Sequence, residues 1–301
     1  MDDHVTGKRE MNDKNEPAYA AATFEQKPVH IDLDYGSARR VFIFGDVHGN
    51  IDPILRAMDK VGYDHEAGDR MISLGDWLDR GNHTTKVAKF IERHKDDLRS
   101  VKGNHEQMLE DAVRLRDGGI SPIDLIKNGG KWILEHLPQD EDGPREDRDE
   151  HGNLLMDHKG RRIVAAVCGY PVALTITTPA GHRIGVVHGE MRRIAGRLDW
   201  NTFTGVLQEQ GPDGFIAADA MWERDEIRRI KHEHAYGSRL RSSDMVENID
   251  HVFHGHTILK EPLVWGNRSW IDIASYKRGE TAFIDVDRWT RDKRITEGPC
   301  K

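Results

Sequence analysis

Cysteine is scarce in this sequence, because its 301 residues include only Cys168 and Cys300. Two cysteines cannot form a disulfide framework or a thiolate zinc site, so we expect a reducing, cytoplasmic setting. No apolar run comes near the ~20 residues of a membrane span. The N-terminal segment MDDHVTGKREMNDKNEP has no apolar stretch of the signal-peptide type. Basic residues number 44 against 52 acidic ones, and the net charge of −8 argues against a nucleic-acid partner.

The composition is that of a polar globular protein, with 37% hydrophobic and 32% charged residues. A chain of this length can bury a substantial core in one large domain or two small ones. Residues 1–28 are polar and lack periodicity, so we expect a disordered tail there and a second short tail over 288–301. We expect a single domain over 29–287, because both halves of the chain end their strands in similar polar loops. The sequence carries no indication of the oligomeric state.

Strand, loop and helix patterns alternate in the first half of the chain. We expect strands at 41–44, 71–74 and 99–102, and helices that begin after Asn50 and at Thr84. Each strand is followed by a loop rich in glycine and polar residues. This alternation predicts an α/β fold, in which functional groups gather where loops leave the carboxyl ends of the strands.

The second half of the chain begins with an acidic segment, QDEDGPREDRDE, at 139–150. We expect a solvated surface excursion over about 139–160. Strand-like runs follow, and we expect strands within RIVAAVCGY (162–170), ALTITT (173–178), RIGVVHG (183–189), HVFHGHT (251–257), NRSWIDIA (267–274) and TAFIDVD (281–287). PAGH, at 179–182, is typical of a hairpin turn.

Five short motifs place acids, amides and histidines at the ends of expected strands. They are GDVHG (45–49), GDWLDRG (75–81), GNHE (103–106), VHGE (187–190) and HGHT (254–257). Each alone has an ordinary explanation: a turn, a surface ion pair, a helix cap or a buried core histidine. Together they supply carboxylate, imidazole and amide ligands without thiolate, which is the ligand set of a two-metal site.

The order of these motifs resembles that of the calcineurin-like metallophosphoesterases, in particular the phosphoprotein phosphatase branch. Asp79 and Arg80 in GDWLDRG are typical of that branch. GNHEQM (103–108), NGGKW (128–132) and MWERDEI (221–227) are similar to motifs of the phage lambda-type and bacterial serine/threonine protein phosphatases. The resemblance implies a central β-sandwich flanked by helices, with the site at the loops that leave the carboxyl ends of the strands.

The resemblance also implies a pair of metal ions and six protein ligands. Asp46 and His48 would hold the first metal, Asp76 would bridge both, and the remaining ligands would hold the second metal. The six expected ligands are Asp46, His48, Asp76, Asn104, His188 and His256. We expect two Mn²⁺ ions, and iron or zinc would also suit these oxygen and nitrogen ligands.

Catalytic and substrate-binding roles follow from the same resemblance. His105 would protonate the leaving alkoxide, with Asp79 keeping it protonated and oriented. Arg80 and Arg224, with Asn104, would bind the phosphate, because guanidinium recognises phosphate oxygens in pairs. For Arg224 an alternative stays open: WERDEIRRIK also offers Arg228 and Arg229, and these arginines could simply form a basic helix face.

The sequence departs from the family pattern at the last two motifs. Ile258 stands where many metallophosphoesterases have a further metal-binding histidine. His254 lies two residues before His256, so both would face the same side of a strand, and we expect only His256 to be a ligand. IDIAS (271–275) replaces a turn that usually contains glycine.

Three functions are compatible with these residues. The leading hypothesis is a metal-dependent hydrolase that removes phosphate from phosphoserine or phosphothreonine in a phosphoprotein or phosphopeptide. A diadenosine tetraphosphatase or another small-molecule phosphoesterase is the alternative, although that tetraphosphatase branch commonly lacks the acid equivalent to Asp79. The third is a non-catalytic metal-binding scaffold for phosphoproteins, which would have lost a ligand or the acid; none is missing here.

Overall fold

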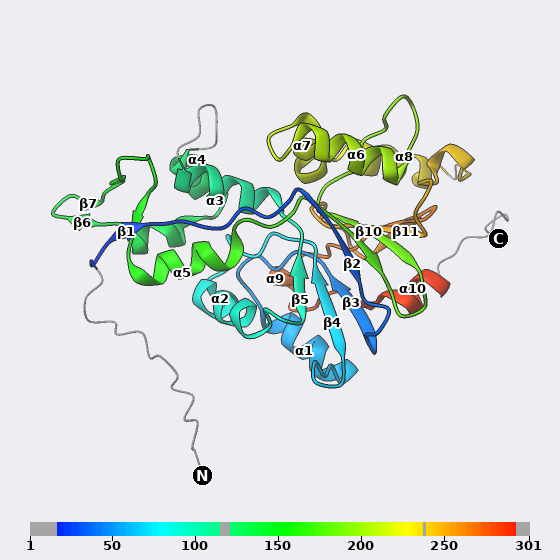
Figure 1. Cartoon of the computed structure of the whole chain (residues 1–301), viewed down its shortest axis with the longest axis horizontal. Helices are drawn as coiled ribbons and strands as arrows, with labels where there is room; N and C mark the ends of the chain where they lie inside the picture. Colours follow the sequence, from blue (N-terminus) through cyan, green and yellow to red (C-terminus); the bar gives the residue numbers. More distant parts are fainter. Residues whose placement is uncertain (1–16, 115–120, 237–238, 293–301) are drawn as a thin grey trace, which may run out of the picture.

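Two β-sheets lie face to face in the computed structural model of this chain, with helices outside them (Figure 1). The structure describes residues 17–114, 121–236 and 239–292. Apolar side chains from both sheets form one core cluster between them, for example Val41 and Ile43 from one sheet with Leu174 and Ile184 from the other. This arrangement is the β-sandwich that the sequence predicted.

The larger sheet has six strands in the described part of the chain. In spatial order they are β12 (Leu263–Trp265), β13 (Arg268–Trp270), β11 (His251–His254), β10 (Arg183–Val187), β9 (Ala173–Thr177) and β2 (His30–Asp34). β9 and β10 form the expected antiparallel hairpin, with Thr177 opposite Arg183. β10, β11 and β13 run parallel, so their carboxyl ends lie at the same edge.

The smaller sheet has four strands. In spatial order they are β14 (Phe283–Asp285), β3 (Arg40–Phe44), β4 (Asp69–Ser73) and β5 (Leu98–Ser100). β3, β4 and β5 are parallel. In β3, Val41 and Ile43 face the other sheet, while Phe42 and Phe44 pack into a second core cluster with helical side chains. Residues 41–44 of this strand are all apolar, as expected for a strand with both faces buried.

The helices cover the outer faces of the sandwich. The helices are α1 (Asp52–Val61), α2 (Thr84–Arg93), α3 (Asn104–Arg114), α4 (Pro122–Lys127), α5 (His158–Val167), α6 (Trp200–Gln210), α7 (Phe215–Trp222), α8 (Asp225–Ala235), α9 (Ser275–Arg278) and α10 (Val286–Asp292). Side chains of α1, α2, α3 and α5 pack in the cluster that contains Phe42 and Phe44, and those of α6 and α7 pack beside β9 and β10. None of the described helices has the length and apolar character needed to span a membrane.

One expected strand is wrong: most of 162–170 belongs to helix α5. Asp157 caps this helix, because its carboxylate accepts a hydrogen bond from the amide of Gly160 (2.7 Å). Ile163, Val164 and Val167 then face the core at helical spacing. The apolar run alone did not distinguish a buried helix from a strand.

The acidic excursion itself carries only short strands. β6 (Gln139–Asp140) and β7 (Gly143–Pro144) form a small hairpin that lies away from the two sheets (Figure 1). The chain then returns through β8 (Leu155–Met156) to α5. Two 3₁₀ helices, η1 (Lys131–His136) and η2 (Ser242–Asp244), complete the described elements.

Parts of both expected tails belong to the folded structure. The tail expected over residues 1–16 lies outside the described residues. Farther along, β1 (Ala20–Ala21) pairs with β8, and Ala22 is fully buried. Residues 17–28 therefore run along the folded body (Figure 1), because a β-bridge and a buried alanine hold them there. At the other end, α10 includes residues 288–292 and buries Thr290. The single domain over 29–287 stays a prediction.

Candidate active site

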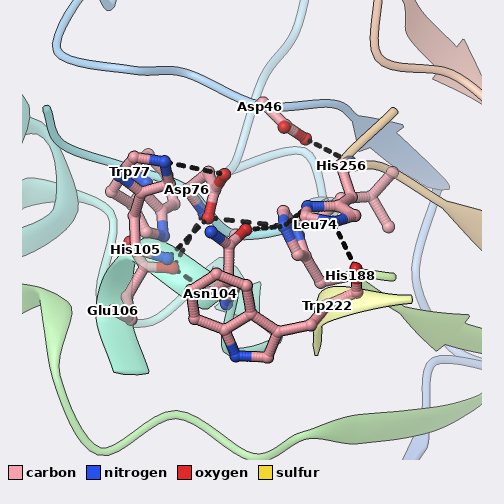
Figure 2. A network of polar contacts seen from close by, with 12 residues as sticks. Asp46, Leu74, Asp76, Trp77, Asn104, His105, Glu106, His188, Trp222 and His256 are labelled. Carbon is pink, nitrogen blue, oxygen red and sulfur yellow. Dashed lines mark hydrogen bonds and ion pairs between the residues drawn. The ribbon is translucent and has the colours of Figure 1, made fainter. Parts of the chain in front are cut away.

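The five motifs meet at one edge of the sandwich. GDVHG, GDWLDRG and GNHE follow the parallel strands β3, β4 and β5, and VHGE and HGHT include the ends of the parallel strands β10 and β11. Figure 2 shows the side chains that this arrangement brings together, with Asp76 between His105 and His188. The strand order thus explains how residues up to 210 positions apart, such as Asp46 and His256, come into contact.

The backbone is unusual at these motifs. Eight described residues other than glycine have positive φ, and five of these were predicted site residues. Those five are His48 (45°), Asp76 (52°), Asp79 (68°), Arg80 (63°) and His256 (62°). Left-handed backbone costs energy for residues with a Cβ, and it is concentrated at functional sites. Space is equally restricted, since a Cβ on Gly103 would lie 2.2 Å from Oδ1 of Asp76.

Glu106, for which the sequence indicated no function, stabilises these turns through hydrogen bonds. Its carboxylate accepts hydrogen bonds from the amides of Asp76 (2.8 Å), Trp77 (2.8 Å) and Gly103 (2.9 Å). Burial raises the pKa of Glu106 to about 7, with Asp76 adding to the effect. The sequence shows this residue only as the glutamate of GNHE. Its hydrogen bonds to the GDWLDRG loop form only when the two loops meet in the folded chain.

Asp46, His48 and Asp76 form the first group of candidate ligands. Nε2 of His48 lies 3.4 Å from Oδ2 of Asp76 and 3.9 Å from Oδ2 of Asp46. Nδ1 of His48 donates to the carbonyl of Leu78 (3.1 Å), which directs the lone pair on Nε2 toward the carboxylates. Burial lowers the pKa of His48 to about 3, so the imidazole is neutral, as a metal ligand must be.

The second group of candidate ligands centres on His188. Its Nε2 lies 3.4 Å from Oδ1 of Asp76, 3.1 Å from Oδ1 of Asn104 and 3.1 Å from Nδ1 of His256. Nδ1 of His188 donates to the carbonyl of Leu74 (2.6 Å). Burial disfavours a charged His188, but Asp76 and Asp46 outweigh it and raise the pKa to about 10. This negative field favours a cation at Nε2, whether a proton or a metal.

His256 completes this group with its other nitrogen. Nε2 of His256 donates to the carbonyl of Trp222 (2.9 Å), which leaves Nδ1 as an acceptor that faces His188 (Figure 2). Burial lowers the pKa of His256 to about 2, with His188 as the next cause. Two groups of possible ligand atoms share Asp76: His48 and His105 lie with it in one group, and His188 and His256 lie with it in the other. The amide oxygen of Asn104 lies beside the second group, and this donor set fits two divalent cations.

His105 is the third member of the group around His48 and Asp76, and it is paired with Asp79. Oδ2 of Asp79 accepts from Nδ1 of His105 (2.6 Å), and Oδ1 accepts from Nε1 of Trp132 (2.8 Å). Burial would lower the pKa of His105, but Asp76 and the hydrogen bond to Asp79 raise it. In the sequence Trp132 stands out only as part of the NGGKW motif. In the structure its hydrogen bond fixes the orientation of the Asp79 carboxylate.

The structure brings Arg80 and Arg224 to the site. Arg80 donates to Nε2 of His48 (2.7 Å) and to Nε2 of His105 (2.9 Å). Nη2 of Arg224 lies 3.3 Å from Nδ1 of His256. The two alternative arginines make contacts elsewhere. Arg228 forms an exposed ion pair with Asp225. The guanidinium of Arg229 forms ion pairs with Glu226 and Asp244.

His254 lies behind the candidate ligands rather than among them. Its Nδ1 donates to the carbonyl of Gly189 (2.8 Å), and its ring stacks on Trp270 with the centroids 4.7 Å apart. Burial lowers its pKa to about 3. His254 therefore supports the backbone next to His188.

Two residues of the IDIAS segment also reach this site. Oγ of Ser275 donates to the carbonyl of Asp46 (2.6 Å). Asp272 is 1% exposed. Burial is the main cause that raises the pKa of Asp46 above its ordinary value, and the charge of Asp272 is the next cause. In the sequence this segment is visible only as a departure in loop shape, because its contacts with the loop after β3 form only in the folded chain.

Comparisons with known proteins show which proteins this chain is similar to. The sequence pattern of the calcineurin-like phosphoesterase family matches residues 39–259. Serine/threonine-protein phosphatase 2 of Salmonella typhimurium is 22% identical over 258 residues, which cover 85% of this chain and 97% of that protein. A symmetrical bis(5'-nucleosyl)-tetraphosphatase of Neisseria gonorrhoeae is 30% identical over 98 residues, or 31% of this chain and 35% of that protein.

A protein serine/threonine phosphatase from Saccharomyces cerevisiae superposes with a TM-score of 0.49 at 15% sequence identity, over 83% of this chain and 73% of that chain. The family match itself spans all motifs from Asp46 to His256 and confirms the fold class expected from the sequence. The chain therefore belongs to the calcineurin-like phosphoesterase family.

Proposed function

We propose that this chain is a serine/threonine protein phosphatase that hydrolyses phosphomonoesters with two divalent cations, most suitably Mn²⁺. The observation that carries the proposal is the convergence of His188 and His256 on Asp76, at the site that also contains a histidine–carboxylate pair and two arginines. Every residue type that phosphate hydrolysis needs is present, which disfavours a non-catalytic scaffold.

The chain's own residues would hold the cations and the substrate. Asp46, His48 and Asp76 would bind the first cation, and Asp76 with three further ligands would bind the second. Those three are Asn104, His188 and His256. The bound pair would supply an activated water molecule and positive charge for the phosphate oxygens. Asn104, next to His105, would also contact the substrate.

Arg80 and Arg224 would bind the phosphate oxygens that the metals leave free. Arg80 now donates to Nε2 of both His48 and His105. A phosphate dianion is a stronger acceptor than a neutral imidazole, so Arg80 would turn to it and release both nitrogen atoms. Arg224 approaches from α8's side of the site, beside His256.

His105 would then act as the general acid. Asp79 binds Nδ1 and favours the imidazolium form, and Nε2 would give its proton to the leaving alkoxide of serine or threonine. Trp132 keeps the Asp79 carboxylate in the required orientation. This assistance matters for a poor leaving group such as a serine alkoxide, and Asp79 therefore supports a phosphoprotein substrate over a tetraphosphate.

A substrate comparison with the metal-stripped chain tests the proposal. Mn²⁺, Fe²⁺ and Zn²⁺ are restored one at a time, and phosphate release is measured from a phosphoserine peptide, diadenosine tetraphosphate and a cyclic nucleotide. We expect metal-dependent activity that is greatest on the phosphopeptide. Higher kcat/KM on diadenosine tetraphosphate would favour the tetraphosphatase alternative, and no activity with any metal would contradict the proposal.

A further inference from the structure

Asp272, just after β13, is a buried acid with an unsatisfied oxygen. Its Oδ1 accepts a hydrogen bond from the amide of Ala274 (2.8 Å). Its Oδ2 is also buried, and no hydrogen-bond partner for it exists among residues 17–114, 121–236 and 239–292. A buried carboxylate oxygen without a partner is costly, so a group outside the protein chain is expected to satisfy it.

The backbone fixes Asp272 beside the loop that carries Asp46. A Cβ added to Gly45 would lie 3.2 Å from Cα of Asp272, so the two chain segments are in direct contact. The amide of Ile271 donates to the carbonyl of His254 (2.9 Å), and Ser275 donates to the carbonyl of Asp46. Asp272 is therefore held at the candidate site by contacts on both of its sides.

The charges around Asp272 are mostly negative. Asp46, Asp76 and Asp272 are each at most 2% exposed, and their carboxylates repel one another through the protein interior. Arg80 and His188 are the cationic groups that act on Asp272. The three buried carboxylates outnumber these two cationic groups, and a buried anion without a counter-charge is strongly disfavoured.

We propose that Asp272 is a further acid of the metal centre and that its Oδ2 stabilises the cation held by Asp46 and His48. The inference rests on the proposed two-metal function and deepens it. Asp272 does not touch the phosphate and is a positioning residue: it would set how tightly the first cation is held. The substitution Asp272→Asn tests this, because asparagine keeps the shape and the Oδ1 acceptor for Ala274 but removes the negative charge.

Calorimetric titration of the metal-stripped chain with Mn²⁺ is the direct measurement. We expect wild type to bind two ions, and Asp272→Asn to weaken one of them by ~10–100-fold while the other stays within a few fold. Asp97→Asn is the matched control, since Asp97 is also buried but accepts its hydrogen bond from Tyr63, outside the candidate ligand groups. The control should titrate like wild type.

Thermal unfolding distinguishes metal binding from a packing role. Without metal, Asp272→Asn should unfold at the wild-type temperature or higher, because it removes repulsion; with Mn²⁺ it should gain less stability than wild type. Unchanged titration of both ions in Asp272→Asn, or a lower unfolding temperature only without metal, would overturn the inference while leaving the proposed function intact. A wild-type chain that binds fewer than two ions would overturn the proposed metal pair, and the inference with it.

Discussion

Nε2 of His188 and Nδ1 of His256 lie 3.1 Å apart although each is oriented by a backbone carbonyl on its far side. The carbonyls of Leu74 and Trp222 accept from the outer nitrogens, so both inner nitrogens face the same point. Asp76 and Asp46 raise the pKa of His188 to about 10, so a proton on its Nε2 satisfies this contact, and a divalent cation would take the place of that proton.

His105→Asn should lower turnover while both metals stay bound. The substitution removes proton donation to the leaving group, a contribution that is typically ~10²–10⁴-fold. The loss should be much smaller on p-nitrophenyl phosphate, whose leaving group needs no proton, than on a phosphoserine peptide. Elemental analysis checks the metal content. Equal losses on both substrates would show that His105 orients the site rather than transferring a proton.

Arg224→Ala should lower kcat/KM by ~10–100-fold, because a charge-assisted hydrogen bond to phosphate is worth ~1.5–3 kcal/mol. Arg228→Ala is the matched control on the same stretch of chain, since its side chain is 69% exposed and pairs with Asp225. Steady-state kinetics on one phosphopeptide compare the two. If Arg228→Ala proves as damaging as Arg224→Ala, the assignment of the phosphate ligand is wrong.

Glu226→Gln should destabilise the protein at neutral pH by an amount on the order of 3 kcal/mol. Glu226 pairs with the buried Arg268 (3.1 Å), and its loss would leave that guanidinium without this partner in the interior. Burial opposes ionisation of Glu226, but hydrogen bonds from Arg193, Arg229 and Arg268 lower its pKa to about 2. Asp225→Asn, in an exposed ion pair, should change stability by less than ~1 kcal/mol.

The difference in stability between wild type and Glu226→Gln should decrease as the pH falls. The pKa of Glu226 is lower in the folded chain than in the unfolded one, so its ionised form stabilises the fold at pH values above its ordinary pKa. This stability is lost as the pH falls toward about 2. The free energies of unfolding of wild type and Glu226→Gln, measured by denaturant titration, should therefore converge below pH ~4. A constant difference would show that the carboxylate charge is not responsible.

Much of this site could be predicted from the sequence because its residues lie in contiguous motifs at strand ends. GDVHG, GNHE and HGHT each carry their chemistry within five residues, and parallel strands bring such loops to one edge. Arg224 could not be separated from Arg228 in this way. Arg224 immediately precedes α8 and Arg228 lies in its first turn, and only the packing of α8 decides which one reaches His256.

The residues that were missed act through contacts that are distant in sequence. Glu106 accepts a hydrogen bond from the backbone amide of Asp76, thirty positions away in the sequence. Trp132 donates to Asp79, which lies fifty-three positions away. Neither contact leaves a periodic signal. The error at α5 has a different origin, because a short run such as IVAAV is compatible with both a buried strand and a helix until its cap at Asp157 is considered.

His256→Ala and His254→Ala should separate a metal ligand from a supporting residue. Nδ1 of His256 faces His188, so its loss should weaken the second metal by ~100-fold or more and leave the enzyme nearly inactive at ordinary metal concentrations. His254 instead donates to the carbonyl of Gly189 and stacks on Trp270. His254→Ala should therefore lower the melting temperature through a buried cavity, yet bind both ions within ~10-fold of wild type and recover most turnover in excess metal. Calorimetric titration and thermal unfolding of both variants give the two readouts. Loss of the second ion in His254→Ala with normal titration of His256→Ala would reverse the assignment, and the ligand set would have to be rebuilt from His254.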